Sequence, residues 1–316
     1  MYFCKIRSGT NQSNFTESEP SLITFYLLYP LILIVSYSPF WVLYGVSDAL
    51  YFIVFHIVGY RKAVVYENLR KSFPDHTEEQ LDEICKRYYR YLCDLLMESL
   101  KTITWTEKDV RKRVTMKNAD LLDELYQKEK SILIVMGHLG NWEWAGPCFS
   151  LNCKHQLFVV YHPLSNPYFE KLFVKSRTKF NTKIIPRANT LRSMIANKKL
   201  ISATALIADQ APTPIHTAVW MDFMNQDTPV FNGPEKLAKM LDYPVVYMHV
   251  SRVKRGYYEV RPTLLFEEPG ESGELEITHE FNRILEKGIR EQPETWLWSH
   301  RRWKHKRPEE LEVVAT

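Results

Sequence analysis

The hydrophobic pattern first separates a polar start from a long apolar segment. Residues 1–21 lack the basic start, short apolar core and cleavage site of a secretory signal, so we expect a loose polar leader. Residues 22–60 are almost continuously apolar, with interruptions at Pro30, Pro39 and Asp48. Because proline breaks backbone hydrogen bonding and a carboxylate is costly in hydrocarbon, we expect no clean span of about 20 residues. A kinked helix, a shallow hairpin and an interfacial helix pair remain open, and the length and Tyr/Trp content favour membrane contact over a buried soluble helix.

Flanking charge and cysteine usage indicate the compartment of the remaining chain. Arg61, Lys62, Arg70 and Lys71 follow the apolar segment directly, and positively charged flanks mark its cytoplasmic side. The cysteines include no CxxC pair and mostly sit within apolar patterns, which favours reduced, buried thiols over disulfides or a zinc site. There are five: Cys4, Cys85, Cys93, Cys148 and Cys153.

An amphipathic helix is predicted within residues 72–101. Thr77 and Gln80 have the spacing of a capping box, in which each side chain bonds the other residue's backbone. Apolar positions then recur at helical spacing from Leu81 to Leu96. We interpret its aromatic stripe as packing surface.

From residue 131 onward, short apolar runs alternate with helical patterns. The expected strands are 131–137, 157–163, 183–187, 202–210, 244–252 and 257–264. The expected helices are near 141–150, 167–179, 188–198, 232–242 and 274–291. Such alternation predicts an α/β domain, placed at residues 61–310, with a mixed sheet flanked by helices. Neither a Rossmann nor a P-loop glycine pattern is found, so nucleotide binding is unsupported.

Composition is that of a folded chain with one basic region. Of the 316 residues, 45% are apolar and 25% charged, and the net charge is only +4, so the distribution of charge carries more information than its total. Residues 296–307 ("WLWSHRRWKHKR") hold five Lys/Arg and no acid. This run could bind nucleic acid by charge and stacking, but no sequence signature of a nucleic-acid-binding fold accompanies it. Phosphorylated lipid head groups fit this run better, and a plain basic tail stays open.

The stretch "ILIVMGHLGNWEW" carries the candidate chemistry. The apolar run predicts a buried strand, Gly137 and Gly140 permit a tight turn, and Asn141 is a good N-cap for the following helix. On a regular helix His138 and Glu143 would point about 140° apart, but the glycine turn lets the imidazole fold back toward the carboxylate.

A carboxylate beside an imidazole fixes its tautomer and leaves one ring nitrogen free to accept a proton. No nearby Ser or Cys has the position of a triad nucleophile, which suggests that the acceptor's own hydroxyl is activated. A capped turn with a solvated His138 and Glu143 is the structural alternative. A metal site is less favoured, because the HExxH motif and a second histidine at a ligand offset are missing.

A second polar pair follows another predicted strand. Asp209 and Gln210 end an apolar run, so we expect them at the same carboxyl-terminal edge of the sheet as His138, where open α/β sheets bind ligands. Capping of a turn is the alternative for this pair.

At these residues the chain resembles the late acyltransferases of lipid A biosynthesis, within the lysophospholipid acyltransferase superfamily and its His-x4-Asp/Glu signature. The resemblance runs over roughly residues 22–307 and includes "NLRKSFPDHTEEQ", "GHLGNWE", "VVYHPLSNPYFEKLFVKSRTKF", "LIADQAP" and "WLWSHRRWK". It implies a glycerolipid acyltransferase-like fold. Two positions depart from the family pattern: His162 replaces an arginine, and "DFMNQ" replaces a Phe-Phe-Gly stretch, and both departures concern acceptor recognition.

The resemblance implies transfer of an acyl chain from acyl carrier protein or coenzyme A to a hydroxyl of a membrane glycolipid such as a lipid A precursor. It also implies a location at the cytoplasmic face of the bacterial inner membrane. His138 would be the general base and Glu143 its partner. The implied substrate-binding residues are Asn141, Arg177, Asp209, Gln210, His300 and Arg301.

Direct attack on a thioester needs a base and oxyanion stabilisation, but neither a metal nor a cofactor. We expect backbone N–H groups near Gly140 and the helix start at Asn141 to stabilise the oxyanion. Acylation of another lipid, such as a lysophospholipid, a phosphoinositide mannoside-like glycolipid or an aminolipid, stays open. A non-catalytic lipid-binding role also stays open.

Overall fold

The computed structural model describes residues 19–213, 215 and 218–308. The predicted leader falls mainly on residues 1–18, outside the described residues. Its last three residues already belong to the first helix, so the helical part begins earlier than the pattern suggested.

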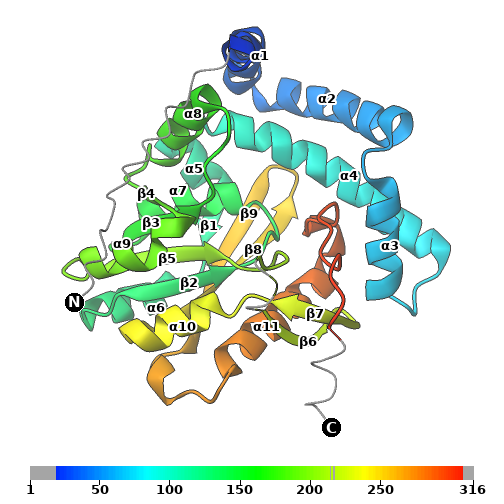
Figure 1. The fold of residues 1–316 in the computed structure, drawn as a ribbon. Helices are drawn as coiled ribbons and strands as arrows, with labels where there is room; N and C mark the ends of the chain where they lie inside the picture. Colours follow the sequence, from blue (N-terminus) through cyan, green and yellow to red (C-terminus); the bar gives the residue numbers. More distant parts are fainter. Residues whose placement is uncertain (1–18, 214, 216–217, 309–316) are drawn as a thin grey trace, which may run out of the picture.

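A seven-stranded mixed sheet forms the centre of the molecule (Figure 1). Its order is β1-β9-β8-β2-β5-β3-β4; β4, β3, β5, β2 and β8 run parallel, β9 is antiparallel to β8, and β1 is parallel to β9. The strands are β1 (Val114–Met116), β2 (Ile132–Met136), β3 (Gln156–Tyr161), β4 (Lys183–Pro186), β5 (Ser202–Ile207), β8 (Val245–Lys254) and β9 (Tyr257–Phe266). All six predicted strands and the mixed sheet are confirmed; the short β1 was not predicted.

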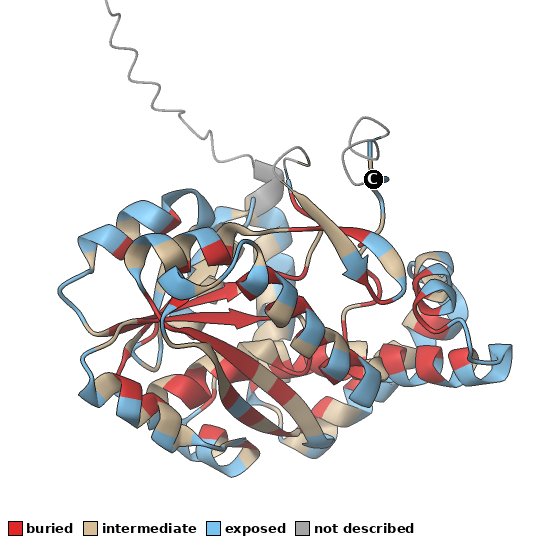
Figure 2. Ribbon diagram, turned by 90° about the horizontal axis from the view of Figure 1, so that it is seen from below, coloured by how far each residue is buried: buried red, intermediate tan, exposed pale blue. Residues whose placement is uncertain are grey.

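Alternating side chains of the strands supply two core layers. In β2, Leu133 and Val135 join the layer under α9, α10 and α11, whereas Ile132, Ile134 and Met136 join the layer under α5, α6 and α7. This arrangement covers both faces of the sheet, and Figure 2 shows its strands largely buried. The covering helices are α5 (Glu107–Arg113), α6 (Ala119–Gln127), α7 (Trp142–Asn152), α9 (Thr190–Ala196), α10 (Gly233–Leu241) and α11 (Glu276–Glu291).

The long amphipathic helix is present as α4 (Glu78–Lys101), with the predicted capping box. The Thr77 hydroxyl accepts from the Gln80 backbone, and the Gln80 side chain accepts from the Thr77 backbone. Helix α3 (Lys62–Ser72) contacts α4, and α8 (Pro167–Arg177) contacts β4. Single 3-10 turns lie at η2 (Arg187–Asn189), η4 (Pro269–Glu271) and η5 (Pro293–Thr295). Within the described part, the cysteines are free and mostly buried, as expected.

The apolar segment folds as a helix pair that packs against α4 (Figure 1). It consists of α1 (Glu19–Tyr37), α2 (Phe40–Tyr51) and the π-helical continuation η1 (Phe52–Val58). Pro39 breaks the chain at the start of α2, but Pro30 lies inside α1. We expected a break at Pro30, which the structure does not show, whereas Asp48 does lie within the longest apolar helix. The 19 residues of Phe40–Val58 are long and apolar enough to cross a membrane, by length and composition alone.

A small antiparallel hairpin stands apart from the main sheet. It comprises β6 (Val219–Phe223) and β7 (Gln226–Val230). Its two-residue loop, Met224 and Asn225, has positive φ at both positions, as a turn that matches the twist of the strands requires. This hairpin was not predicted, because Met-Asn lacks the glycine of typical hairpin turns. The stretch "DFMNQ", which differs from the family pattern, thus forms the tip of this hairpin.

Candidate active site

Parallel pairing brings the two predicted polar pairs to one edge of the sheet. Met136 of β2 lies beside Ile207 of β5, and each strand ends there. His138 and Asp209 each follow two residues later, so the predicted placement of both at the carboxyl-terminal edge is confirmed.

Asp209, and not Glu143, holds the imidazole. Asp209 Oδ1 lies 2.6 Å from His138 Nδ1, and Oδ2 accepts a 2.8 Å hydrogen bond from the His138 backbone N–H. The predicted contact between His138 and Glu143 was therefore wrong. The prediction rested on spacing within one segment, whereas the carboxylate that contacts the ring comes from the neighbouring strand.

Asp209 is buried and fully ionised at neutral pH. Burial by itself would raise its pKa, but attraction to His138 and hydrogen bonds from His138 and Trp296 lower the pKa to about 2. The Trp296 indole Nε1–H donates to Oδ2 at 2.8 Å. This contact was not predicted, because the run at 296–307 was interpreted by its charge.

The free ring nitrogen of His138 faces a side-chain amide. A buried carboxylate at Nδ1 selects the tautomer with the proton on Nδ1, which leaves the Nε2 lone pair available. Gln210 Nε2 lies 3.4 Å from His138 Nε2, and the Trp142 ring packs edge-on against the imidazole at 4.9 Å between centroids. The ring is thus fixed by contacts on several sides, with one nitrogen poised to accept a proton.

Glu143 lies in the first turn of α7, as predicted, but its partner is Arg177. The Arg177 guanidinium donates to both carboxylate oxygens, at 2.6 and 3.1 Å. Burial by itself would lower the pKa of Arg177, but the Glu143 charge raises it. This planar, two-bonded pair holds Arg177 in a defined orientation.

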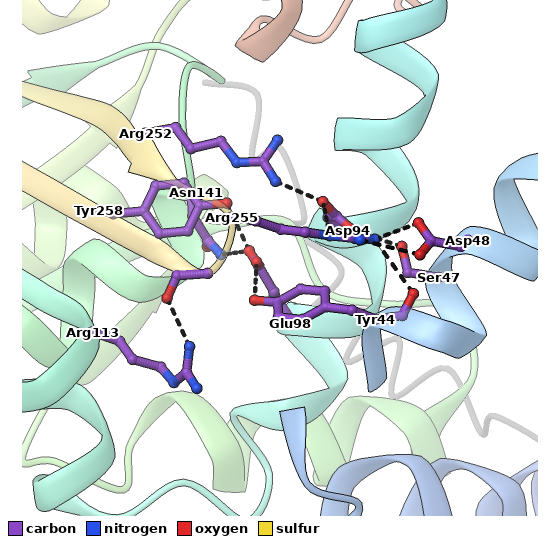
Figure 3. Close-up of polar contacts among 11 residues, drawn as sticks. Tyr44, Ser47, Asp48, Asp94, Glu98, Arg113, Asn141, Arg252, Arg255 and Tyr258 are labelled. Atoms are coloured by element: carbon purple, nitrogen blue, oxygen red, sulfur yellow. Dashed lines mark hydrogen bonds and ion pairs between the residues drawn. The ribbon is translucent and has the colours of Figure 1, made fainter. Parts of the chain in front are cut away.

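Asn141 and Gly140 have structural contacts in place of the predicted substrate contacts. Asn141 is buried, its Oδ1 caps α7 by accepting from Trp144, and its Nδ2–H donates to Glu98 at 2.7 Å (Figure 3). The Gly140 backbone N–H donates to the Thr295 carbonyl. The Gly140 N–H and the Asn141 side chain thus already have protein partners, so the expected oxyanion donor at Gly140 is corrected.

Two residues in the middle of the basic run, His300 and Arg302, pack onto the protein. His300 is partly buried and its Nε2 accepts from the Ala211 backbone at 3.3 Å, so it supports the loop after Gln210. Burial lowers the pKa of His300 to about 4, and it is neutral at pH 7. Arg301 is exposed, whereas the side chain buried in the protein is that of Arg302, which donates to a backbone carbonyl of β7. Neither His300 nor Arg301 lines the cavity beside His138.

A largely apolar cavity of about 620 Å³ opens beside His138. Its polar lining includes His138, Glu143, Arg177, Gln210 and His162. Its apolar lining comes from β2, β3, β5 and α7, and includes Ile134, Met136, Ala145, Phe149, Leu157 and Ala205. Such a cavity accepts a hydrocarbon chain, with the polar groups available for chemistry beside it.

Comparison with known proteins identifies the family. The family model for bacterial lipid A biosynthesis acyltransferase matches residues 13–305. The lipid A biosynthesis palmitoleoyltransferase of Escherichia coli is 25% identical, over 77% of this chain and 79% of its own length. The lipid A biosynthesis lauroyltransferase of the same organism is 23% identical, over 86% and 88%. A lipid A biosynthesis acyltransferase of Haemophilus influenzae is 26% identical, over 79% of each chain. The chain therefore belongs to the bacterial lipid A biosynthesis acyltransferase family, whose members transfer acyl groups.

Proposed function

We propose that this enzyme transfers a fatty acyl chain from a thioester, carried by acyl carrier protein or coenzyme A, to a hydroxyl of a lipid A precursor. The observation that carries this proposal is the pair of His138 and Asp209 beside an apolar cavity. A base with one free nitrogen suits proton removal from an alcohol, and the cavity suits an acyl chain.

In the proposed reaction, His138 Nε2 takes the hydroxyl proton while the acceptor oxygen attacks the thioester carbonyl. The new C–O bond gives a tetrahedral oxyanion, and its collapse breaks the C–S bond. The departing sulfur takes the proton from the imidazolium, which restores the base. Asp209 stabilises the imidazolium and keeps the tautomer throughout.

Side-chain donors are the groups we assign to the oxyanion, since the Gly140 N–H is occupied. Gln210 Nε2 lies beside His138 Nε2 and lines the cavity. Arg177 also lines the cavity and is oriented by Glu143. A donor placed near the developing charge supplies a large part of the rate enhancement in such reactions.

We further propose that the enzyme works on the cytoplasmic face of the inner membrane. The exposed surfaces of α1, α2 and η1 are rich in large apolar side chains, which is unusual for a surface facing water. They include Tyr26, Leu27, Leu31, Ile34, Tyr37, Trp41, Phe52 and Ile57. Arg61 and Lys62 follow η1, as expected for a cytoplasmic flank.

Purified enzyme, a radiolabelled acyl thioester and a lipid A precursor in micelles test the proposal. We expect a product with one additional ester-linked chain in mass spectra, and its loss in His138→Ala. Undiminished transfer by a folded His138→Ala protein would exclude the general-base role, and binding of lipid without transfer would indicate a lipid-binding protein.

A further inference from the structure

A second, charged pocket lies between α2, α4, η5 and the turn that joins β8 to β9. Its volume is about 480 Å³. It is lined by four arginines, three carboxylates and one tyrosine: Arg87, Arg90, Arg252, Arg255, Asp48, Asp94, Glu294 and Tyr51. Positive charge exceeds negative charge by one in this lining, and the proposed chemistry at His138 uses none of these residues.

The inner part of this arginine pocket is a set of ion pairs (Figure 3). Asp94 is buried and accepts from Arg252 at 2.6 Å and from Arg255 at 2.7 Å. Arg255 also reaches Asp48 of α2 at 2.6 Å. These contacts pair both carboxylates and hold the two inner arginines in defined positions.

The outer part has arginines that an anion can reach. Arg90 has no ion pair among the residues that the structure describes; its guanidinium lies over the Tyr51 ring at 5.1 Å. Arg87 meets Glu294 only at 3.8 Å, beyond a good hydrogen bond. Both side chains are exposed on one face of α4. Two forked guanidiniums that converge on one pocket suit a phosphate, which accepts paired hydrogen bonds from each.

The arginine pocket is close to the catalytic cavity. Glu294 lines the former and Leu297 lines the latter, so their Cα atoms are at most about 11 Å apart along three residues of chain. Between them, Thr295 accepts from Gly140 and Trp296 donates to Asp209. One short segment thus supplies a lining residue to each of the two sites.

The pocket also adjoins the apolar surface. Asp48 and Tyr51 lie on α2, within the helix that is long and apolar enough to cross a membrane. An anionic group held here would lie beside that helix.

We propose that the arginine pocket binds a phosphate ester on the head group of the acceptor glycolipid, while His138 deprotonates a hydroxyl of the same molecule. This inference rests on the proposed function. It assigns recognition of the acceptor phosphate to Arg87 and Arg90, whereas the sequence suggested the run at 296–307.

The test uses the full-length enzyme in neutral detergent micelles, with one acceptor in phosphorylated and dephosphorylated form. We expect the wild type to have the lower KM for the phosphorylated acceptor, and inorganic phosphate to compete with it. Arg90→Gln and Arg87→Gln should each raise that KM by about 10-fold, with kcat, the donor KM and the KM for the dephosphorylated acceptor unchanged. Arg283→Gln, an exposed arginine of α11 outside the pocket, is the control and should match wild type.

Binding is also measured without turnover, in His138→Ala with and without Arg90→Gln, so that failure of the transfer reaction does not decide this question. Equal affinity of these two proteins for the phosphorylated acceptor would overturn the proposal. A defect confined to vesicles of anionic phospholipid would also overturn it, because the pocket would then bind the membrane and not the acceptor. Absence of transfer by wild type to any acceptor would overturn the proposed function alone.

Discussion

The carboxylate of Asp209 contacts both the ring and the backbone of His138, with Oδ1 2.6 Å from Nδ1 and Oδ2 2.8 Å from the backbone nitrogen. One side chain therefore fixes the position, the orientation and the tautomer of the imidazole. Because Trp296 also donates to Oδ2, the carboxylate has little freedom to move. Rigid support of this kind is what a general base requires.

Asp209→Asn should lower kcat for acyl transfer by about 10²–10⁴-fold, because general-base catalysis is worth that much. The amide keeps the size of the side chain, but its NH₂ faces Nδ1 and selects the tautomer without a lone pair on Nε2. Steady-state kinetics on protein with a wild-type melting temperature would measure this. Wild-type kcat in a folded Asp209→Asn protein would exclude the assigned role.

Glu143→Gln should have a smaller effect, on the order of 10-fold, since the removed charge orients Arg177 and does not contact the imidazole. The same enzyme assay provides the comparison. A double-mutant cycle with Arg177→Gln should give a coupling of about 1–3 kcal/mol in transition-state free energy. If Glu143→Gln were as damaging as His138→Ala while Asp209→Asn stayed active, Glu143 would be the partner of the base after all.

Gly140→Ala should destabilise the fold by about 2–5 kcal/mol, through strain and overpacking together. Its φ is +61°, and an added Cβ would lie 2.1 Å from the Val250 carbonyl oxygen. Gly45→Ala, at an exposed position of α2, is the control. Its Cβ would meet nothing within 4 Å, so this change should stabilise by about 0.5–1 kcal/mol. Denaturant titrations of both proteins give the values, and equal stabilities would contradict the backbone argument.

Glu98 should make stability depend on pH. Burial raises its pKa from 4.5 to about 7, although Tyr258 and Tyr44 donate to it (Figure 3). Between these two pH values the folded state keeps a proton that the unfolded chain releases, so the free energy of unfolding should fall as pH rises through this window. Glu98→Gln cannot titrate. Its difference in stability from wild type should therefore change across the window, and a constant difference would show that Glu98 does not carry this proton.

Trp41→Glu should weaken binding to phospholipid vesicles. This side chain is 78% exposed on α2, and burial of a large aromatic side chain in lipid is worth about 2–3 kcal/mol, or roughly 30–150-fold in partitioning. Met240→Glu places the same charge at an exposed apolar position of α10 and should leave binding unchanged. Co-sedimentation with vesicles compares the two, and equal binding would exclude this surface as the membrane contact.

The hydrophobic pattern of the chain determined the architecture. Every strand predicted from residue 131 onward is present, because a sheet covered on both faces requires continuous apolar runs. The same pattern located His138 and Asp209, since each follows the end of a buried strand. It missed β1 and the hairpin of β6 and β7, which are short and lack a period or a glycine turn.

Contacts between side chains were decided by the tertiary structure. Spacing within one segment suggested Glu143 as the partner of His138, yet Asp209 lies 71 residues away along the chain and beside it in space. Tertiary packing likewise joined the Asn141 side chain to Glu98 and gathered the arginines of α4, β8 and the following turn into one pocket. The periodicity of a sequence reports which face of an element is buried, but the partner of a polar group depends on which elements become neighbours, and that is set by the packing of the whole chain.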